Sequence, residues 1–210
     1  DGTTETIVTD KTWKTASSPV TYSGIYGGED YDARLEQKGW SQTDFDDSGW
    51  NNVLIAREPK GILRPETDYP LKIMEFFDDA EIKKINDTIF LYDFRQNASG
   101  IVRLKVKGKR GMTVKLIPGE LIDDDFHVNQ KASGSPYSFS YTLKGEEEEV
   151  WSPRFTYYGF RYVEVEGAVP EGISNPVDLP VITGLELLHT RNSSRSEERR
   201  VGKECCTPCR

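Results

Sequence analysis

The sequence predicts an all-β protein, in which an antiparallel β-sandwich follows an incomplete β-sandwich domain and precedes a disordered C-terminal tail. Three observations lead to this prediction. Several short segments alternate apolar and polar residues with the period of two that marks a half-buried strand. Turn-forming residues separate these segments, as they do in antiparallel sandwiches. No segment has the apolar spacing of a long amphipathic helix.

The composition fits a globular chain and argues against two classes of partner. The chain has 210 residues, of which 36% are hydrophobic and 30% charged, and its net charge is −8 at pH 7. This length allows one large domain or two small ones. The acidic balance argues against binding to nucleic acids or to anionic membranes, because both need clustered Lys and Arg. No stretch approaches the ~18 consecutive apolar residues of a membrane-spanning helix, and no signal peptide is visible.

The N-terminal region, residues 1–57, is predicted to be the C-terminal part of a β-domain, because it holds too few strand-like segments to close a core. Its best helical candidate is 31–38, roughly two turns long, with Gly39 as a C-terminal cap. The segment 43–50 is typical of turns capped by side chains. Its carboxylates belong to Asp44, Asp46 and Asp47. Residues 58–87 begin with a proline-rich, aperiodic stretch and are predicted to be a linker.

Residues 88–194 carry the clearest strand patterns and are predicted to form the complete sandwich. In 101–107 the alternate residues Val102, Leu104 and Val106 are apolar, whereas the residues between them are basic. A turn at 108–111 and a second alternating segment at 112–116 predict a hairpin. Further strands are predicted at 137–143, 149–151, 154–158, 160–166 and 181–190.

Charged residues and histidines in this region have two interpretations each. The run of four glutamates at 146–149 could hold a cation, but such a run is more often the solvated tip of a hairpin. His127 follows three aspartates at 123–125, which suggests either an acid–histidine constellation or a solvated loop, and we favour the loop. His189 alternates with apolar residues in the last strand, which favours a packed or edge residue over a catalytic base.

No catalytic signature is present. The sequence lacks a phosphate-binding loop, a His-Glu-x-x-His motif and a Gly-x-Ser-x-Gly elbow. Paired carboxylates could serve glycoside hydrolysis, but the sequence does not place two of them at the required separation. Aromatic residues could stack on sugars, although their strand spacing places most of them in the core; they are Tyr141, Trp151, Tyr157, Tyr158, Phe160 and Tyr162. We therefore predict no catalytic, cofactor-binding or metal-ligating residue in this chain.

The C-terminal residues 195–210 have an unusual composition, because they hold all three cysteines, Cys205, Cys206 and Cys209. A metal or redox site would need a more complete ligand set, and a charged disordered terminus is the plainer alternative. Residues 195–205 match the in-frame translation of a common sequencing adapter. We therefore expect this tail to be an artefact and the natural sequence to continue past Ser194.

Two sets of motifs follow one another along the chain. The first set is Tyr26-Gly-Gly-Glu-Asp-Tyr-Asp-Ala-Arg-Leu-Glu36, Gly39-Trp40 and Phe45-Asp-Asp-Ser-Gly-Trp50. The second set is Tyr92-Asp-Phe-Arg-Gln-Asn-Ala-Ser-Gly100, 102–108, 141–145 and Trp151-Ser-Pro-Arg-Phe-Thr-Tyr-Tyr-Gly-Phe-Arg-Tyr-Val-Glu-Val165. The first set resembles the end of the N-terminal β-domain of the bacterial α-L-rhamnosidases of glycoside hydrolase family 78, and the second set resembles their concanavalin-like, jelly-roll domain. The order and spacing agree from about residue 25 to Ser194.

One position departs from the family pattern. Arg95 stands where the family usually has glycine in Asp-Phe-Gly-Gln-Asn. Because a glycine there would suit a positive φ, we expect arginine to require a relaxed turn at this point.

The resemblance implies an inverting hydrolase of terminal α-L-rhamnose, whose two catalytic glutamates lie in a helical (α/α)6 barrel that follows these β-domains. Residues 188–194 resemble the junction that enters the barrel. We therefore expect a non-catalytic fragment, truncated before the barrel, with no cofactor, with the barrel and a rhamnosyl glycan as its partners, and with a periplasmic or extracellular location.

Two other functions remain open at this stage. The first is a free-standing carbohydrate-binding sandwich, with or without a bridging calcium ion. The second is a purely structural interaction domain.

Overall fold

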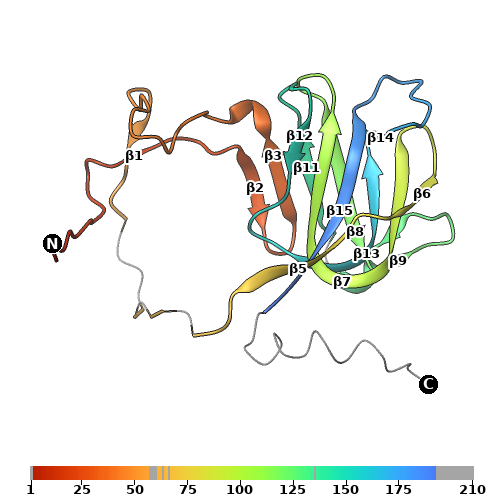
Figure 1. Ribbon diagram of the computed structural model, residues 1–210, viewed down its shortest axis with the longest axis horizontal. Coiled ribbons are helices and arrows are strands. Elements are labelled where there is room, and N and C mark those ends of the chain that lie inside the picture. Colours follow the sequence, from red (N-terminus) through yellow and green to blue (C-terminus); the bar gives the residue numbers. More distant parts are fainter. Residues whose placement is uncertain (1, 57–60, 63, 66, 135, 193–210) are drawn as a thin grey trace.

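The structure is a computed structural model that describes residues 2–56, 61–62, 64–65, 67–134 and 136–192 (Figure 1). The expectations for the tail at 195–210, including its three cysteines, concern residues outside this part. The described chain is all-β, as predicted, with two single-turn helices, η1 (Ala33–Leu35) and η2 (Lys131–Ser133). No helix in it is long and apolar enough to cross a membrane.

The strands follow one another along the chain with short connections after residue 67. In order they are β1 (Lys14–Thr15), β2 (Val20–Gly24), β3 (Gly28–Asp32), β4 (Asn51–Asn52), β5 (Leu71–Phe77), β6 (Glu81–Lys84), β7 (Ile89–Lys107), β8 (Thr113–Gly119), β9 (Leu121–Ile122), β10 (Val128–Asn129), β11 (Ser138–Thr142), β12 (Glu149–Trp151), β13 (Tyr158–Glu166), β14 (Val169–Pro170) and β15 (Val181–Asn192).

Both layers of the sandwich share the long strand β7. Its first part pairs with β13 through residues 89–93 and 98–100 and with β6 through 90–93, whereas its last part, 100–107, pairs with β15 and β12. The first layer therefore runs β6-β7-β13-β8-β11-β3-β2. The second layer runs β12-β7-β15, with β5 and β14 both on the other side of β15. Most pairings are antiparallel, but β3 with β11 and β14 with β15 are parallel.

The hydrophobic core lies between these layers, and the alternation of the sequence correctly predicts its members. Val102, Leu104 and Val106 are fully buried, whereas the basic residues between them are partly exposed. The largest fully buried side chains come from both layers, and they are Tyr141, Phe90, Phe139, Phe160, Leu104 and Leu116. Burial of this apolar surface is the main force that holds the two layers together.

The predicted hairpin between 101–107 and 112–116 is wrong. This part of β7 pairs with β15 and β12, whereas β8 pairs with β11 and β13, so the turn at 108–111 crosses from one layer to the other. Alternation shows which face of a strand is buried but not which strand lies beside it. A link across the core therefore produces the same sequence pattern as a hairpin.

The predicted helix at 31–38 is also wrong. Its first residues belong to β3, and only Ala33–Leu35 turn, as the 3-10 helix η1. The carboxylate of Asp32 caps this turn by accepting a hydrogen bond from Arg34 N at 3.0 Å. Tyr31 lies opposite Tyr141 in the parallel pairing, and their rings stack with centroids 5.8 Å apart. Pairing with β11 thus outweighs the weak local preference for a helix.

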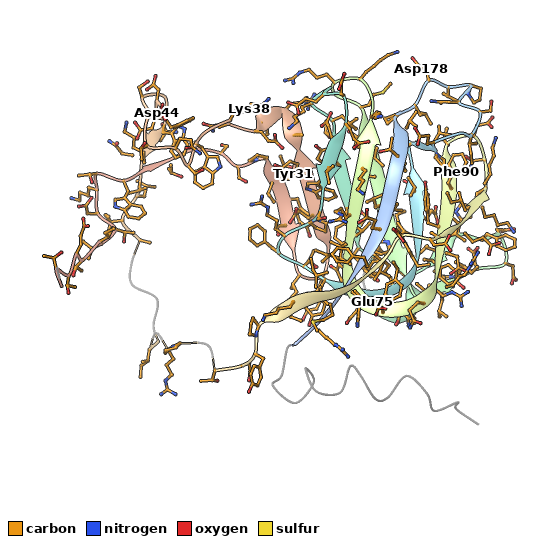
Figure 2. All side chains as sticks on the ribbon, viewed as in Figure 1. Tyr31, Lys38, Asp44, Glu75, Phe90 and Asp178 are labelled. Carbon is orange, nitrogen blue, oxygen red and sulfur yellow. The ribbon has the colours of Figure 1, made fainter. Side chains whose placement is uncertain are left out.

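The regions before the predicted sandwich contribute strands to it. The β2–β3 hairpin extends the first layer beyond β11, while β5 and β6, which lie within 58–87, pair with β15 and β7. Most side chains of β5 and β6 are exposed, so they show no burial pattern that would mark them as strands. Figure 2 shows Asp44 on the N-terminal extension, away from the sandwich, and Tyr31 on β3, which lies between β11 and the edge strand β2.

Candidate functional site

A cleft of about 1170 Å³ opens beside the C-terminal end of β15. Segments that are distant in the sequence form its wall: the β2–β3 turn, the start of β5, the residues Ser133, Gly134 and Tyr137 before β11, and the loop between β12 and β13. Asn192 at the end of β15 pairs with Leu71, which lines the cleft. The pairing of β3 with β11 and of β5 with β15 is what brings these four segments together.

Exposed aromatic rings surround this cleft. Tyr26 is 78% exposed, Phe155 is 68% exposed and Tyr157 is 51% exposed. A neighbouring pair, Tyr137 and Tyr158, stacks with ring centroids 3.9 Å apart, and the Tyr158 hydroxyl donates a hydrogen bond to Ile25 O at 2.9 Å. The sequence predicted a core position for most aromatics, which holds for Tyr141, Trp151 and Phe160 but not for Tyr157.

A buried carboxylate holds the loop between β12 and β13, which carries Phe155 and Tyr157. Glu29 on β3 is fully buried, and its Oε2 accepts a hydrogen bond from Arg154 N at 3.1 Å. Burial raises the pKa of Glu29, while the backbone hydrogen bond from Arg154 partly opposes this effect. Glu29 Oε1 has no hydrogen-bond partner in the described part of the chain. The hydrogen bond from Arg154 N to Glu29 therefore fixes the loop that carries the exposed rings of Phe155 and Tyr157.

Among the residues that the structure describes, each of two clefts contains a single carboxylate. Glu120 lines the cleft beside β15, where its Oε1 accepts a hydrogen bond from Asn97 Nδ2 at 2.8 Å. A second cleft of about 560 Å³ lies between the N-terminal segment and the loop at 154–155, and its only carboxylate among the described residues is Glu36. Neither arrangement provides the acid and base that glycoside hydrolysis requires.

His127 forms a pair that the sequence did not indicate. Its Nδ1 lies 3.0 Å from Oε1 of Glu164, a buried residue of β13, and Val128 N donates to the other oxygen of Glu164 at 2.8 Å. The hydrogen bond with Glu164 raises the pKa of His127, and burial opposes this effect. The carboxylate of Asp123 accepts backbone hydrogen bonds within the loop, and its charge also helps to raise the pKa of His127. The prediction of a solvated loop is therefore only partly right, because the contact of His127 with Glu164 attaches this loop to the sheet.

His189 is a packed residue, as predicted. Its Nδ1 lies 2.8 Å from Ser99 O, and its ring lies 6.4 Å from that of Phe77. The turn prediction for 43–50 is also confirmed, since Asp46 Oδ1 accepts a hydrogen bond from Ser48 N at 2.9 Å. Asp47 pairs with Lys14 at 2.7 Å.

Of the four glutamates at 146–149, one is buried and the other three are exposed. Glu149 is buried, and its carboxylate accepts hydrogen bonds from the Tyr141 hydroxyl at 2.8 Å and from three successive backbone N–H groups at 144–146. Glu146 pairs with Lys38 at 2.8 Å and with Lys144 at 3.3 Å. The segment links the two layers and is not a hairpin tip, because β12 pairs with β7. No group of metal-ligating side chains occurs among the described residues.

Arg95 keeps the backbone conformation that favours glycine. Its φ is 60°, so the expected relaxed turn is wrong. Asp93 Oδ1 accepts a hydrogen bond from Arg95 N at 2.7 Å, and Arg161 donates to both carboxylate oxygens of Asp93 at 2.7 and 2.8 Å. The hydrogen bond from Arg161 lowers the pKa of Asp93. Asp93 thus stabilises a tight β-bulge, in which the single residue Arg161 of β13 lies opposite four residues of β7.

Comparison with known proteins identifies the fold family. Residues 1–75 match the model of the α-L-rhamnosidase N-terminal domain, and residues 83–185 match that of the bacterial α-L-rhamnosidase concanavalin-like domain. The chain belongs to the α-L-rhamnosidase family. Both matches occur in the order that the sequence motifs predicted.

Individual members of the α-L-rhamnosidase family agree with this assignment. The α-L-rhamnosidase of Streptomyces avermitilis is 38% identical over 80% of this chain, which corresponds to 16% of that protein. Its structure in complex with L-rhamnose superposes with a TM-score of 0.80, at 35% identity, over 91% of this chain and 18% of that one. The α-L-rhamnosidase structure from Dictyoglumus thermophilum gives a TM-score of 0.78, at 34% identity, over 89% and 20%. The chain therefore spans about a fifth or less of these relatives.

Proposed function

We propose that the chain is a non-catalytic β-region of an α-L-rhamnosidase, whose whole protein removes terminal α-L-rhamnose from glycosides with inversion. The observation that carries this proposal is the match to both β-domains of the family together with clefts that hold one carboxylate each. An inverting glycosidase needs two carboxyl groups on opposite faces of the sugar. In this proposal the catalytic pair belongs to a helical barrel, and the β-region packs against that barrel and shapes one wall of its active-site region.

The proposed division of the chain places the end of an N-terminal β-domain at 1–57, a linker at 58–87 and the concanavalin-like sandwich at 88–194. The sandwich accounts for nearly all of the core residues. Strands from the two earlier regions extend its layers, so the three parts would act as one support for the barrel.

An aryl α-L-rhamnoside assay tests the proposal. We expect the purified chain to release no phenol, while the Streptomyces avermitilis enzyme, as a positive control, hydrolyses the same substrate. Circular dichroism of the same sample verifies that the chain is folded. Hydrolysis above the blank, in an activity that co-purifies with the folded chain, would contradict the proposal that the chain is non-catalytic.

A free-standing carbohydrate-binding module is the second candidate, favoured by the exposed rings of Tyr26, Phe155 and Tyr157. The size of the native protein separates the two. Antibodies against this chain should detect, in extracts of the source organism, a protein several times larger than 23.8 kDa if the first proposal is right. A native band near that mass would support the module. Cell fractionation with the same antibodies tests the proposed periplasmic or extracellular location.

A further inference from the structure

We propose that the cleft beside β15 binds a 6-deoxyhexose unit, such as a rhamnosyl residue of a glycan, in contact with Phe155 and Tyr157. The choice of sugar class rests on the proposed function. The cleft is formed by the β2–β3 turn, the start of β5 and the loop between β12 and β13.

The exposed rings are the first argument for a sugar. Phe155 and Tyr157 lie on one short loop, and Tyr26 reaches the same cleft from the β2–β3 turn. Large aromatic side chains gain much by burial, so three rings exposed by more than half at one cleft indicate a surface that meets a ligand. The C–H face of a pyranose is apolar and flat, and it suits the face of such a ring.

The charges of the cleft favour a neutral ligand with many hydroxyl groups. Arg154 and Glu120 both line the cleft, and no ion pair to either is present in the described part of the chain. An anion would face Glu120 and a cation would face Arg154. Sugar hydroxyl groups both donate and accept hydrogen bonds, so one sugar can satisfy a guanidinium and a carboxylate together.

Two threonines add unused hydrogen-bonding groups to the wall. The hydroxyl oxygens of Thr156 and Thr190 are buried and have no partner in the described part of the chain. An unpaired buried hydroxyl is unfavourable. Both residues line the cleft, so a change of χ1 rotamer that exposes either hydroxyl group would let a ligand pair with it.

The aliphatic part of the wall selects the 6-deoxy sugar. Ile25, Ile73 and Ile101 line the cleft together with Leu71. A methyl group at C6 gains contact with these side chains, whereas the hydroxymethyl group of an ordinary hexose would lose hydration there. The volume of about 1170 Å³ slightly exceeds the ~300–1,000 Å³ typical of small-molecule sites, which leaves room for a neighbouring sugar.

Titration of the full chain with L-rhamnose, followed by NMR or calorimetry, tests the site. L-mannose is the matched ligand control, because it differs from L-rhamnose only by a hydroxyl group at C6. We expect saturable binding of L-rhamnose with a dissociation constant on the order of millimolar. We expect L-mannose to bind several-fold more weakly. Lack of saturation by L-rhamnose would overturn the proposal, and equal binding of L-mannose would overturn its preference for the 6-deoxy sugar.

Paired tyrosine variants locate the binding. Tyr157→Ala and Tyr69→Ala each remove a ring that is about half exposed, at 51% and 52%, but Tyr69 does not line the cleft. Tyr157→Ala should weaken L-rhamnose binding about tenfold and Tyr69→Ala should leave it unchanged. Equal effects of the two variants would place the sugar elsewhere and contradict the proposal. Failure of binding with no hydrolysis of the aryl rhamnoside would leave the proposed function intact.

Discussion

Arg95 occupies a left-handed backbone conformation, with φ at 60°, inside the tight bulge of β7. A non-glycine residue there costs about 1 kcal/mol or more, because its Cβ crowds the backbone. The ion pair of Arg95 with Glu81, at 3.6 Å between exposed side chains, contributes little to offset this cost. The strain persists because Asp93 and Arg161 fix the bulge from both sides.

Arg95→Gly should therefore stabilise the fold by up to about 1 kcal/mol, because glycine adopts this φ without strain although it loses more backbone freedom on folding. Urea denaturation measures the change in the free energy of unfolding. Arg95→Ala is the matched control, since it removes the same ion pair but keeps a Cβ, and it should not stabilise. A gain of equal size in both variants would show that the side chain of arginine, not its backbone, carries the strain.

Glu149 is the residue whose replacement should harm the fold most through polar contacts. Glu149→Gln should lower the free energy of unfolding by about 2–4 kcal/mol. The NH2 group of glutamine cannot accept the hydrogen bonds that one carboxylate oxygen of Glu149 accepts, so buried donors lose their partner. Glu147→Gln, at an exposed neighbouring position, should change the free energy of unfolding by less than about 0.5 kcal/mol. Thermal melts of both variants suffice, and equal melting temperatures would refute the structural role of Glu149.

The pair of His127 and Glu164 gives the stability a dependence on pH. The pKa of His127 is raised above 6.5 in the folded state, so the folded chain holds this proton more tightly than the unfolded chain does. The resulting stabilisation is fully present below about pH 6.5 and is lost as the pH rises through the raised pKa. His127→Gln should therefore destabilise more at pH 6 than at pH 9 in urea denaturation. A difference that does not vary with pH would contradict this account.

At the scale of elements, the sequence could predict which faces are buried but not which strands are neighbours. The alternation of Val102, Leu104 and Val106 is a direct consequence of one-sided burial. Nothing in that pattern distinguishes a hairpin from a link across the core, and nothing local marks β3 as the parallel partner of β11. The cleft was equally hidden, because it forms only where four distant segments meet.

The β2–β3 hairpin should be an obligatory part of the sandwich. A chain that begins at residue 69 keeps β5 and β6 but lacks the hairpin, so it would leave β11 as an open edge and expose Tyr141 and Trp151 beside the missing Tyr31. We expect such a chain to lose cooperative unfolding and to aggregate. A chain that begins at residue 18 keeps the hairpin and should melt like the full chain. Gel filtration and thermal melts of the two truncations decide between these outcomes.

At the scale of the whole molecule, the two layers should not unfold independently, because β7 belongs to both. Unfolding curves followed by tryptophan fluorescence and by circular dichroism should therefore coincide in a single transition. The chain has four tryptophans, so the fluorescence is followed in a variant in which Trp13, Trp40 and Trp50 are replaced by phenylalanine. In this variant Trp151 reports on the second layer, since β12 pairs with β7 in that layer. Two separate transitions would show that the bend within β7 does not couple the layers.

The long-range pairings also determine when each strand can find its partner during synthesis. The parallel partner of β3 is β11, more than a hundred residues later, and the partner of β5 is the last strand, β15. During synthesis β3 can pair with β2 at once but lacks its parallel partner until β11 has been made, whereas β5 lacks its partner until almost the entire described chain has left the ribosome. Contacts between such distant residues slow folding and prolong the exposure of open edges. We expect nascent chains that end before β15 to depend on chaperones.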